Sequence, residues 1–218
     1  MKLFLDSVRL PEIETVMARG FVAGVTTNPT FLRAEAPVRP LAHLERIVAL
    51  VRPLELPLSV QVMTTDPGRM VRQAERLRDE LEYDGLVVKV PCGWDELAVI
   101  AELHRRGIEV NCTACMTAMQ VMMAAAAGAR YVTLFYGKMS DVGIDAAAVV
   151  DETGASLRRS GSRCELVVAS ILKAYDVDEV MRHGADVATV PYRFLPMLSQ
   201  HPKTAEAVSA FSESFMPV

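Results

Sequence analysis

The sequence lacks the features that mark several large classes of protein. No stretch approaches the roughly 18 consecutive apolar residues of a membrane-spanning helix, so we expect no contact with a membrane. The formal net charge is −4 and the basic residues form no cluster, which argues against nucleic acid as a partner. The chain begins directly with a strand-like segment at residues 2–6 rather than with a signal peptide, so we expect a cytoplasmic protein.

Cysteine is also scarce, and the sequence offers few metal ligands. The four cysteines, Cys92, Cys112, Cys115 and Cys164, are too few and too scattered for a disulfide scaffold. Cys112 and Cys115 form a C-x-x-C motif of the kind found in redox and zinc sites, but no second pair and no nearby histidine completes four zinc ligands. We therefore interpret these thiols as reduced and buried. Because the histidines fall in predicted helices or loops and form no cluster with Asp and Glu, we expect no metal and no cofactor.

Apolar residues, by contrast, are abundant. They make up 51% of the 218 residues, enough to form a large core in one domain. A pattern recurs in which a helix ends, a glycine follows, and an apolar strand begins at once, as around Gly107, Gly128 and Gly184. Strands that alternate with helices are typical of parallel sheets. The predicted strands lie at residues 2–6, 21–25, 58–62, 86–90, 108–112, 130–135, 164–169 and 186–190.

Eight parallel strand–helix units close into a barrel. The clearest predicted helices lie at residues 41–51, 70–81, 95–103, 116–127, 144–159 and 176–182. We therefore predict an α/β fold: a single (β/α)8 TIM barrel over residues 1–218, with an extra C-terminal helix at about 202–216. A doubly wound open sheet is the alternative, but it usually carries a glycine-rich phosphate loop after its first strand, and this chain has none there.

One lysine lies within an apolar strand. Lys89 is in the middle of the run 85–91, which is rich in valine, ends in proline and has the composition of a buried parallel strand. Burial lowers the pKa of a lysine because the charged form loses its water, and the resulting neutral amine is a nucleophile for Schiff-base chemistry with carbonyls. The alternative is that Lys89 lies at the strand end and reaches solvent or pairs with a carboxylate.

Polar residues close most of the predicted strands. In a barrel of this kind the active site lies at the C-terminal ends of the strands, so these side chains are expected to converge. The set is Asp6, Thr26, Asn28, Ser59, Gln61, Lys89, Asn111, Thr113 and Ser170. Each has a structural alternative, because Asp6 could cap a helix, Asn28 could begin a turn, and serine or threonine often satisfies backbone groups. Their number around one buried lysine favours a catalytic site.

Short motifs along the whole chain resemble the transaldolase family, and specifically its short members, which include fructose-6-phosphate aldolase. The motifs are Phe4-Leu5-Asp6, Thr26-Thr27-Asn28-Pro29, Gln61-Val62-Met63, Val88-Lys89-Val90-Pro91 and Ala169-Ser170. The match runs from the first strand to the last helix. The resemblance implies a (β/α)8 barrel, a lysine Schiff base without metal, a sugar as substrate, and a homo-oligomer that is a pentamer or decamer.

The resemblance also implies a role for each matching residue. Lys89 would attack the ketone of a ketose, and Asp6 would act as general acid and base. Gln61 and Thr113 would hold a water molecule that relays protons. The residues that would bind the dihydroxyacetone part of the sugar or lie beside it are Thr26, Asn28, Ser59, Asn111, Phe135 and Ser170.

Positions that separate the two activities of this family are mixed in this chain. Phe135, Asn111 and Ser59 resemble transaldolases, whereas Gln61 resembles the aldolases. We therefore expect an enzyme that cleaves a ketose and transfers or releases a dihydroxyacetone unit. The alternatives are a lysine aldolase with another donor and a non-enzymatic barrel that serves as a binding protein.

The far end of the sugar site departs more from the family. Lys138 and Leu172 stand where the resemblance implies arginines, and Lys173 follows Leu172. Lysine supplies a point charge without the bidentate fork of arginine. We expect an anionic acceptor aldehyde held mainly by Lys138, and the head group of the sugar could be a phosphate, a sulfonate or neutral.

Overall fold

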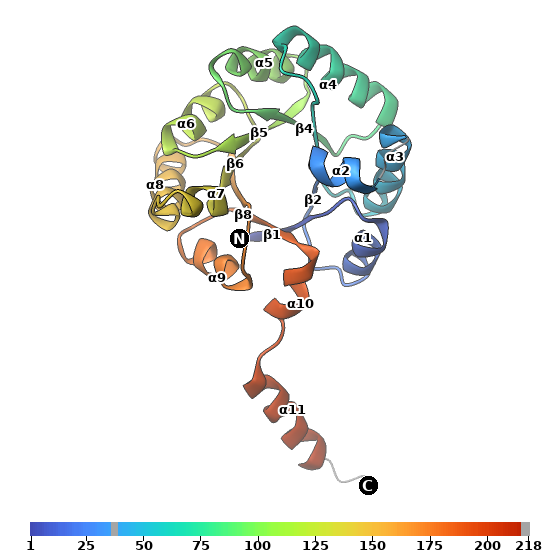
Figure 1. Cartoon of the computed structure of the whole chain (residues 1–218), viewed down its shortest axis with the longest axis vertical. Coiled ribbons are helices and arrows are strands. Elements are labelled where there is room, and N and C mark those ends of the chain that lie inside the picture. The colour runs from blue at the N-terminus through green and yellow to red at the C-terminus, as the bar shows by residue number, and fades with distance from the viewer. Residues whose placement is uncertain (36–38, 215–218) are drawn as a thin grey trace.

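The structure is a computed structural model that describes residues 1–35 and 39–214. Its centre is a closed barrel of eight parallel strands that follow one another in sequence order (Figure 1). The strands are β1 (Lys2–Asp6), β2 (Val25–Thr26), β3 (Leu58–Gln61), β4 (Leu86–Pro91), β5 (Glu109–Cys115), β6 (Tyr131–Phe135), β7 (Glu165–Ala169) and β8 (Val187–Pro191). β1 pairs with β8 along its whole length, which closes the barrel and confirms the predicted (β/α)8 fold.

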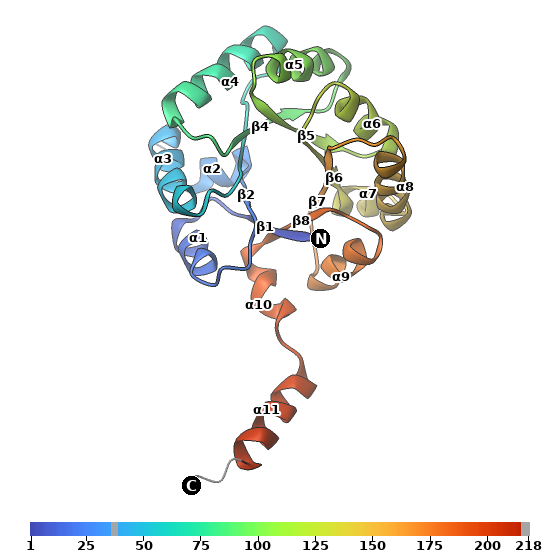
Figure 2. The same cartoon turned by 180° about the vertical axis from the view of Figure 1, so that it is seen from behind.

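Helices surround the barrel, as Figure 2 shows from behind. They are α1 (Leu10–Met17), α2 (Pro29–Glu35), α3 (Pro40–Val51), α4 (Pro67–Leu81), α5 (Trp94–Arg105), α6 (Ala118–Ala126), α7 (Tyr136–Asp141), α8 (Ala146–Arg159), α9 (Ala174–Arg182) and α10 (Leu195–Leu198), with short 3-10 turns at Arg52–Leu54 and Tyr192–Phe194. The six helices predicted from the sequence are all present. α4 begins at Pro67, three residues before the predicted range, because the Asp66 carboxylate accepts a hydrogen bond from the Arg69 amide and Pro67 occupies the first turn.

The second strand is shorter than predicted. The sequence predicts a strand over residues 21–25, whereas β2 covers only Val25 and Thr26. The preceding segment still bonds to β1, through Ala23 N to Leu3 O at 2.8 Å and Leu5 N to Gly24 O at 2.9 Å, but it does not form a regular strand. Gly24 lies against the ring of Phe4, where a side chain would not fit.

The interior of the barrel is layered. One apolar cluster lies inside the barrel and consists of Phe4, Val87, Tyr131, Val167 and Val187, one residue from each of five strands. The Phe4 and Tyr131 rings meet edge to face with their centroids 5.9 Å apart. Successive inward side chains of a strand are two residues apart. The next layer toward the C-terminal ends of these strands therefore contains position 6 of β1 and position 89 of β4, both chosen from the sequence as functional.

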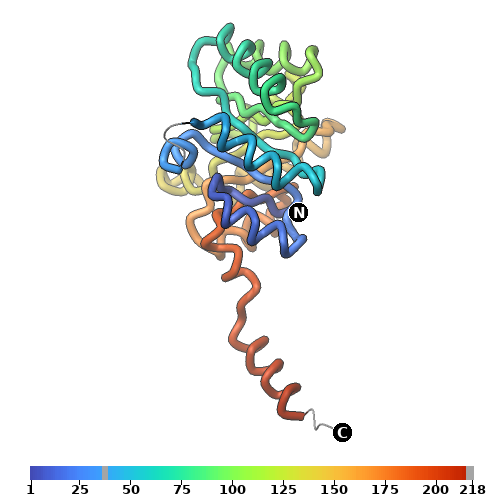
Figure 3. Tube along the Cα trace, turned by 90° about the vertical axis from the view of Figure 1, so that its right-hand side faces the viewer, coloured from blue at the N-terminus to red at the C-terminus, as the bar shows by residue number. Residues whose placement is uncertain are grey.

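The C-terminal helix extends away from the barrel. α11 (Pro202–Ser214) lies beyond α10 and projects outward in the side view of Figure 3. The predicted range 202–216 agrees with it up to residue 214, and residues 215 and 216 lie outside the described residues. Every residue of α11 is exposed in the single chain. Among the described residues, no helix has the length and hydropathy needed to span a membrane.

Candidate active site

A cavity of about 410 Å³ opens at the C-terminal ends of the barrel strands. Most of the residues predicted as functional line it: Asp6, Thr26, Asn28, Gln61, Lys89, Thr113, Phe135 and Ser170. A larger cavity of about 500 Å³ lies between α1 and the segment 192–200, but among the described residues no acid, lysine, histidine or cysteine lines it. Of these two cavities, the one at the C-terminal ends of the strands therefore contains the chemically active groups.

Lys89 occupies the floor of this cavity. Its neighbours across the sheet are Gln61 on β3 and Asn111 on β5, and the residue is only 6% exposed. The ammonium nitrogen Nζ donates a hydrogen bond to the Thr27 carbonyl oxygen at 3.0 Å. Burial lowers the pKa of Lys89, and the negative charge of Asp6 opposes this shift in part. The amine is therefore easier to deprotonate than that of an exposed lysine.

Asp6 is the carboxylate of the cavity. Burial raises its pKa, while the charge of Lys89 and a hydrogen bond from Thr26 oppose that rise. Thr26 Oγ1 lies 3.2 Å from Asp6 Oδ1 and 2.6 Å from Thr189 Oγ1. A raised pKa keeps a carboxyl group protonated to a higher pH, which favours its use as a proton donor and acceptor.

A buried hydrogen-bond network supports the strands beside Lys89. Asn111 Nδ2 donates to Ser59 Oγ at 3.4 Å, and Thr133 Oγ1 donates to Asn111 Oδ1 at 2.7 Å. The network joins β3, β5 and β6. Ser59 and Asn111 are almost completely buried and do not line the cavity, although both were chosen from the sequence to bind sugar hydroxyls. Their contact with a substrate stays a prediction.

Thr113 presents an unpaired hydroxyl to the cavity. Its Oγ1 is buried, and it has no hydrogen-bond partner among the described residues. Buried polar atoms are nearly always paired, so an unpaired one that faces a cavity is suited to bind a ligand or a water molecule. Gln61 lines the same cavity. This placement is compatible with the relay that the family resemblance implies for Gln61 and Thr113.

The backbone after β7 is held in an unusual conformation. Ser170 has a φ of 62°, a left-handed value that is uncommon for a residue with a side chain. Its carbonyl oxygen accepts a hydrogen bond from Gly137 N at 3.0 Å, and a side chain at Gly137 would collide with that oxygen. α7 and the end of β7 are therefore fixed together, with Ser170 in the cavity wall. Strained backbone of this kind often occurs at functional sites.

Lys138 lies outside the cavity lining. It is in α7, its side chain is 62% exposed, and its Nζ lies 3.7 Å from Asp141 Oδ2. The residue that precedes α7, Phe135, does line the cavity. Lys138 is thus close in sequence to a residue of the cavity wall but does not itself line the cavity.

Sequence reasoning missed two threonines of the barrel strands that line the cavity. Thr133 lies two residues before Phe135 on β6, and Thr189 lies two residues after Val187 on β8. Thr189 is the single polar side chain in an otherwise apolar strand, which is the same signal that identified Lys89. Both could have been found by applying that signal to every predicted strand.

The fold and the position of this cavity are those of a barrel enzyme, because the active sites of (β/α)8 enzymes lie at the C-terminal ends of the strands. The model of the Transaldolase/Fructose-6-phosphate aldolase family matches residues 3–216. The chain therefore belongs to this family and is an enzyme of the transaldolase and aldolase class.

Individual relatives agree with this assignment. The chain is 36% identical to a "Probable transaldolase" of Thermoplasma acidophilum and 34% identical to that of Thermoplasma volcanium, each over 100% of this chain and 96% of the relative. Among solved structures, thiamine phosphate pyrophosphorylase from Pyrococcus furiosus matches with a TM-score of 0.63 at 12% identity, over 87% of this chain and 85% of that one. That likeness concerns the fold alone.

Replacement of Asp6 by asparagine should move the titration of Lys89 to lower pH. The charge of Asp6 raises the pKa of Lys89 against the effect of burial, and asparagine removes this charge. The neutral amine should therefore predominate from a lower pH upward in Asp6→Asn. Carbamoylation by cyanate, which needs a neutral amine, followed across pH by peptide mass mapping, measures the change without requiring catalysis.

The exposed Lys203 in the same digests is the internal control, and its profile should be the same in both proteins. A Lys89 profile that is unchanged, or that moves to higher pH, would show that Asp6 does not act on the amine through its charge.

Proposed function

We propose that the protein is a Schiff-base transaldolase that cleaves a ketose and transfers a dihydroxyacetone unit to an anionic aldehyde. The observation that carries the proposal is the buried Lys89 amine, which shares a cavity with the carboxyl group of Asp6. The cavity lining is otherwise made of neutral hydrogen-bonding and apolar groups, which suit the hydroxyls of a sugar.

The first stage is formation of an iminium ion. The neutral Lys89 amine attacks the ketone carbon, and a carbinolamine forms. Protonation of its hydroxyl by Asp6 allows water to leave, and the carbon–nitrogen double bond carries the positive charge that withdraws electrons from the neighbouring carbons. The lowered pKa of Lys89 and the raised pKa of Asp6 both favour the protonation states that this stage needs.

The second stage breaks the carbon–carbon bond. Asp6, now a carboxylate, takes the proton of the C4 hydroxyl as the bond between C3 and C4 breaks. The electron pair moves into the iminium and leaves an enamine of dihydroxyacetone on Lys89, while the aldehyde departs. Gln61 and Thr113 support proton transfer through a water molecule at the unpaired Thr113 hydroxyl.

Two fates of this enamine distinguish the activities of the family. Attack on a second aldehyde gives transaldolase activity, whereas protonation and hydrolysis release free dihydroxyacetone, as in a fructose-6-phosphate aldolase. The names of the relatives and Phe135 in the cavity wall support the transaldolase activity. Product analysis with and without an added acceptor aldehyde separates the two, and free dihydroxyacetone at the same rate in both cases would favour the aldolase.

Lys89→Met should abolish turnover while the fold is retained. Methionine has a similar length and no amine, so the nucleophile is lost and packing is roughly kept. We expect kcat to fall by a factor of about 10³ or more, as when other enzymes lose their nucleophile. Borohydride reduction in the presence of fructose 6-phosphate or dihydroxyacetone, followed by intact mass, should add mass to the wild type and none to the variant.

Lys2→Met is the matched control for this experiment. Lys2 lies at the opposite end of a barrel strand, is exposed, and pairs with Glu165. This variant should be trapped like the wild type. Retention of turnover and of trapping in Lys89→Met would rule out the proposed mechanism.

The proposal extends to the far end of the substrate, where Lys138 supplies a positive charge beside the cavity. Apart from Lys89, no lysine or arginine lines the cavity itself within the described residues. Lys138 is therefore proposed to hold the anionic head group from the rim, in exchange for its contact with Asp141. A point charge of this kind suits a sulfonate or a phosphate that is only partly enclosed.

Lys138→Met should raise the KM for an anionic sugar about tenfold, a loss of about 1.4 kcal/mol in binding. It should leave kcat nearly unchanged, because Lys138 does not touch the reacting carbons. Steady-state kinetics with fructose 6-phosphate and with a sulfonated analogue measure both constants. Lys203→Met removes an exposed lysine of α11 and should change neither. If KM stays the same for both sugars in Lys138→Met, this lysine does not bind the head group.

We also propose that the protein is a homo-oligomer in which α11 packs on another copy of the chain. Val208 and Phe211 on this helix are 56% and 72% exposed in the single chain, a large apolar exposure for two residues one turn apart. The family resemblance suggests five or ten copies.

Phe211→Asp should lower the molar mass of the full chain in solution toward that of the monomer, because a carboxylate cannot be buried cheaply in an apolar contact. Ser212→Asp adds the same charge at the next position and should leave the mass unchanged. Light scattering after gel filtration measures both. A monomeric wild type would contradict the proposal.

A further inference from the structure

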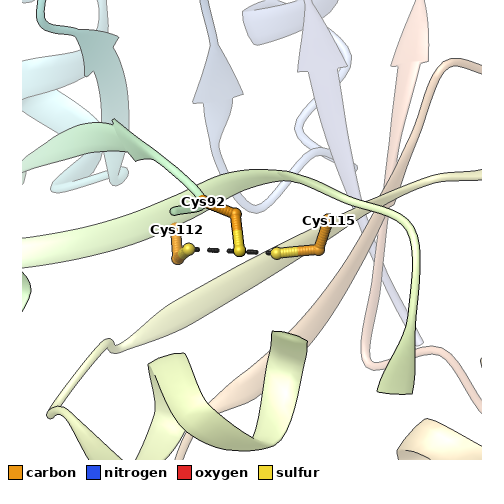
Figure 4. A group of neighbouring side chains, drawn as sticks. All are labelled: Cys92, Cys112 and Cys115. Carbon is orange, nitrogen blue, oxygen red and sulfur yellow. Dashed lines mark hydrogen bonds between the residues drawn. The ribbon is translucent and has the colours of Figure 1, made fainter. Parts of the chain in front are cut away.

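Three cysteine sulfurs lie close together on β5 and just after β4, the strand that carries Lys89. Cys112 and Cys115 both belong to β5, and Cys92 follows the end of β4. Their Sγ atoms all lie within 4.8 Å of one another, and Cys112 Sγ is 3.8 Å from Cys115 Sγ (Figure 4). Sequence analysis found no third ligand for the C-x-x-C motif. The third thiol comes from the neighbouring strand, which the sequence spacing did not reveal.

An irregularity in β5 brings its two cysteines together. Residues three apart on a regular strand face opposite sides of the sheet, so Cys112 and Cys115 should point away from each other. Cys112 pairs with Val132 and Cys115 with Leu134, so β5 contains one residue more than β6 over this interval. The extra residue is accommodated at Ala114, which has a left-handed backbone conformation with a φ of 65°. A bulge of this type turns the following side chain to the other face.

The cluster lies on the outer face of the barrel wall. Cys112 and Cys115 are fully buried in the apolar layer between the strands and the surrounding helices, and Cys92 at its edge is half-buried. Asn111 and Thr113, which flank Cys112, are among the buried polar residues on the active-site side. The backbone of Cys92 is bonded directly to this strand, because Cys92 N donates to Thr113 O at 2.8 Å.

We propose that Cys92, Cys112 and Cys115 together bind one soft metal ion through three thiolate sulfurs. The site is separate from the sugar cavity and does not depend on the proposed catalytic chemistry. The half-buried Cys92 provides the side from which an ion enters. Binding replaces the three thiol protons by the metal and releases them to the solvent, with no transfer of electrons.

The spacing of the sulfurs fits such an ion. Two sulfurs bound to one tetrahedral zinc ion at about 2.3 Å lie about 3.8 Å apart, which is the distance found between Cys112 and Cys115. Cys92 already lies within 4.8 Å of both, so a small movement of its side chain completes the set.

The donor set restricts the choice of ion. Three thiolates select Zn²⁺ or Cu⁺, whereas Mg²⁺ and Ca²⁺ require oxygen ligands. In the described part of the chain, no histidine, cysteine or carboxylate joins the group as a fourth ligand. Zn²⁺ would therefore complete its coordination with a water molecule on the Cys92 side, while Cu⁺ would use the three sulfurs alone. Both ions share the same three-sulfur site, and the experiment distinguishes them.

Formation of a disulfide between two of these cysteines is the alternative to metal binding. Hydrogen bonds from Cys112 and Cys115 lower the pKa of Cys92, and a thiolate beside two thiols is also what oxidation requires. The experiment must therefore be carried out without oxygen, and free thiols must be counted before and after metal is added.

The test uses the full chain, reduced and stripped of metal. One equivalent of Zn²⁺ or Cu⁺ is added anaerobically, the protein is separated from free ion by gel filtration, and bound metal and free thiols are measured. We expect one ion per chain, loss of three titratable thiols, and a higher Tm in the metal-bound form, because an ion that binds only the folded state stabilises it.

Single substitutions identify the ligands. Cys92→Ala should weaken binding more than about 100-fold, since even a residue that only orients a metal ligand costs 10–100-fold. Cys112→Val and Cys115→Val keep apolar volume in the buried positions and should also abolish retention of the metal, with folding checked by circular dichroism. Cys164→Ala is the matched control, because Cys164 is a buried thiol that does not belong to the group, and it should bind like the wild type.

Retention of Zn²⁺ alone or of Cu⁺ alone supports the site and identifies its ion. Absence of retained metal while all four thiols are shown to be free would overturn the proposal. Equal binding by Cys92→Ala and the wild type would do the same.

Discussion

The feature on which the rest of the site depends is the removal of one amine from water. Lys89 is 6% exposed, and its ammonium form is destabilised because the barrel interior cannot replace the lost hydration. Within the described residues, the Thr27 carbonyl oxygen and the charge of Asp6 compensate in part. The amine is held in place by a strand that is paired on both sides, so its position cannot relax toward solvent.

The layered interior explains why this burial is tolerated. An apolar layer around Phe4 and Tyr131 closes the barrel below the lysine, and polar side chains two residues further along the strands form the cavity above it. Ser59, Asn111 and Thr133 satisfy one another within this second layer. A fully paired network of this kind fixes the strands in one arrangement, because any change of register would leave buried polar atoms unpaired.

β4 and β5 place reactive side chains on both faces of the barrel wall. Their inward side chains include Lys89 and Thr113, which line the cavity, whereas Cys112 and Cys115 lie in the apolar layer outside. Ala114 connects the two faces of the wall. It lines the cavity beside Thr113, and the bulge at Ala114 turns Cys115 to the outer face. An ion bound to the three sulfurs would therefore act on the same short segments of backbone that position the catalytic groups.

The sequence by itself determined the barrel, the order of its strands and the choice of Lys89 and Asp6. Period-two alternation, glycines after helices and a charged residue in an apolar strand are local signals, and they depend only on residues near one another in the chain. Tertiary structure alone decided how deep each polar side chain lies. Ser59 and Asn111 are buried without lining the cavity, and Lys138 is exposed and does not line it either, although all three follow or lie within strands as predicted. It also decided that Cys92 joins Cys112 and Cys115, because pairing between two strands and a one-residue bulge set that contact. Depth and cross-strand contact depend on register and backbone distortion, which a sequence pattern does not specify.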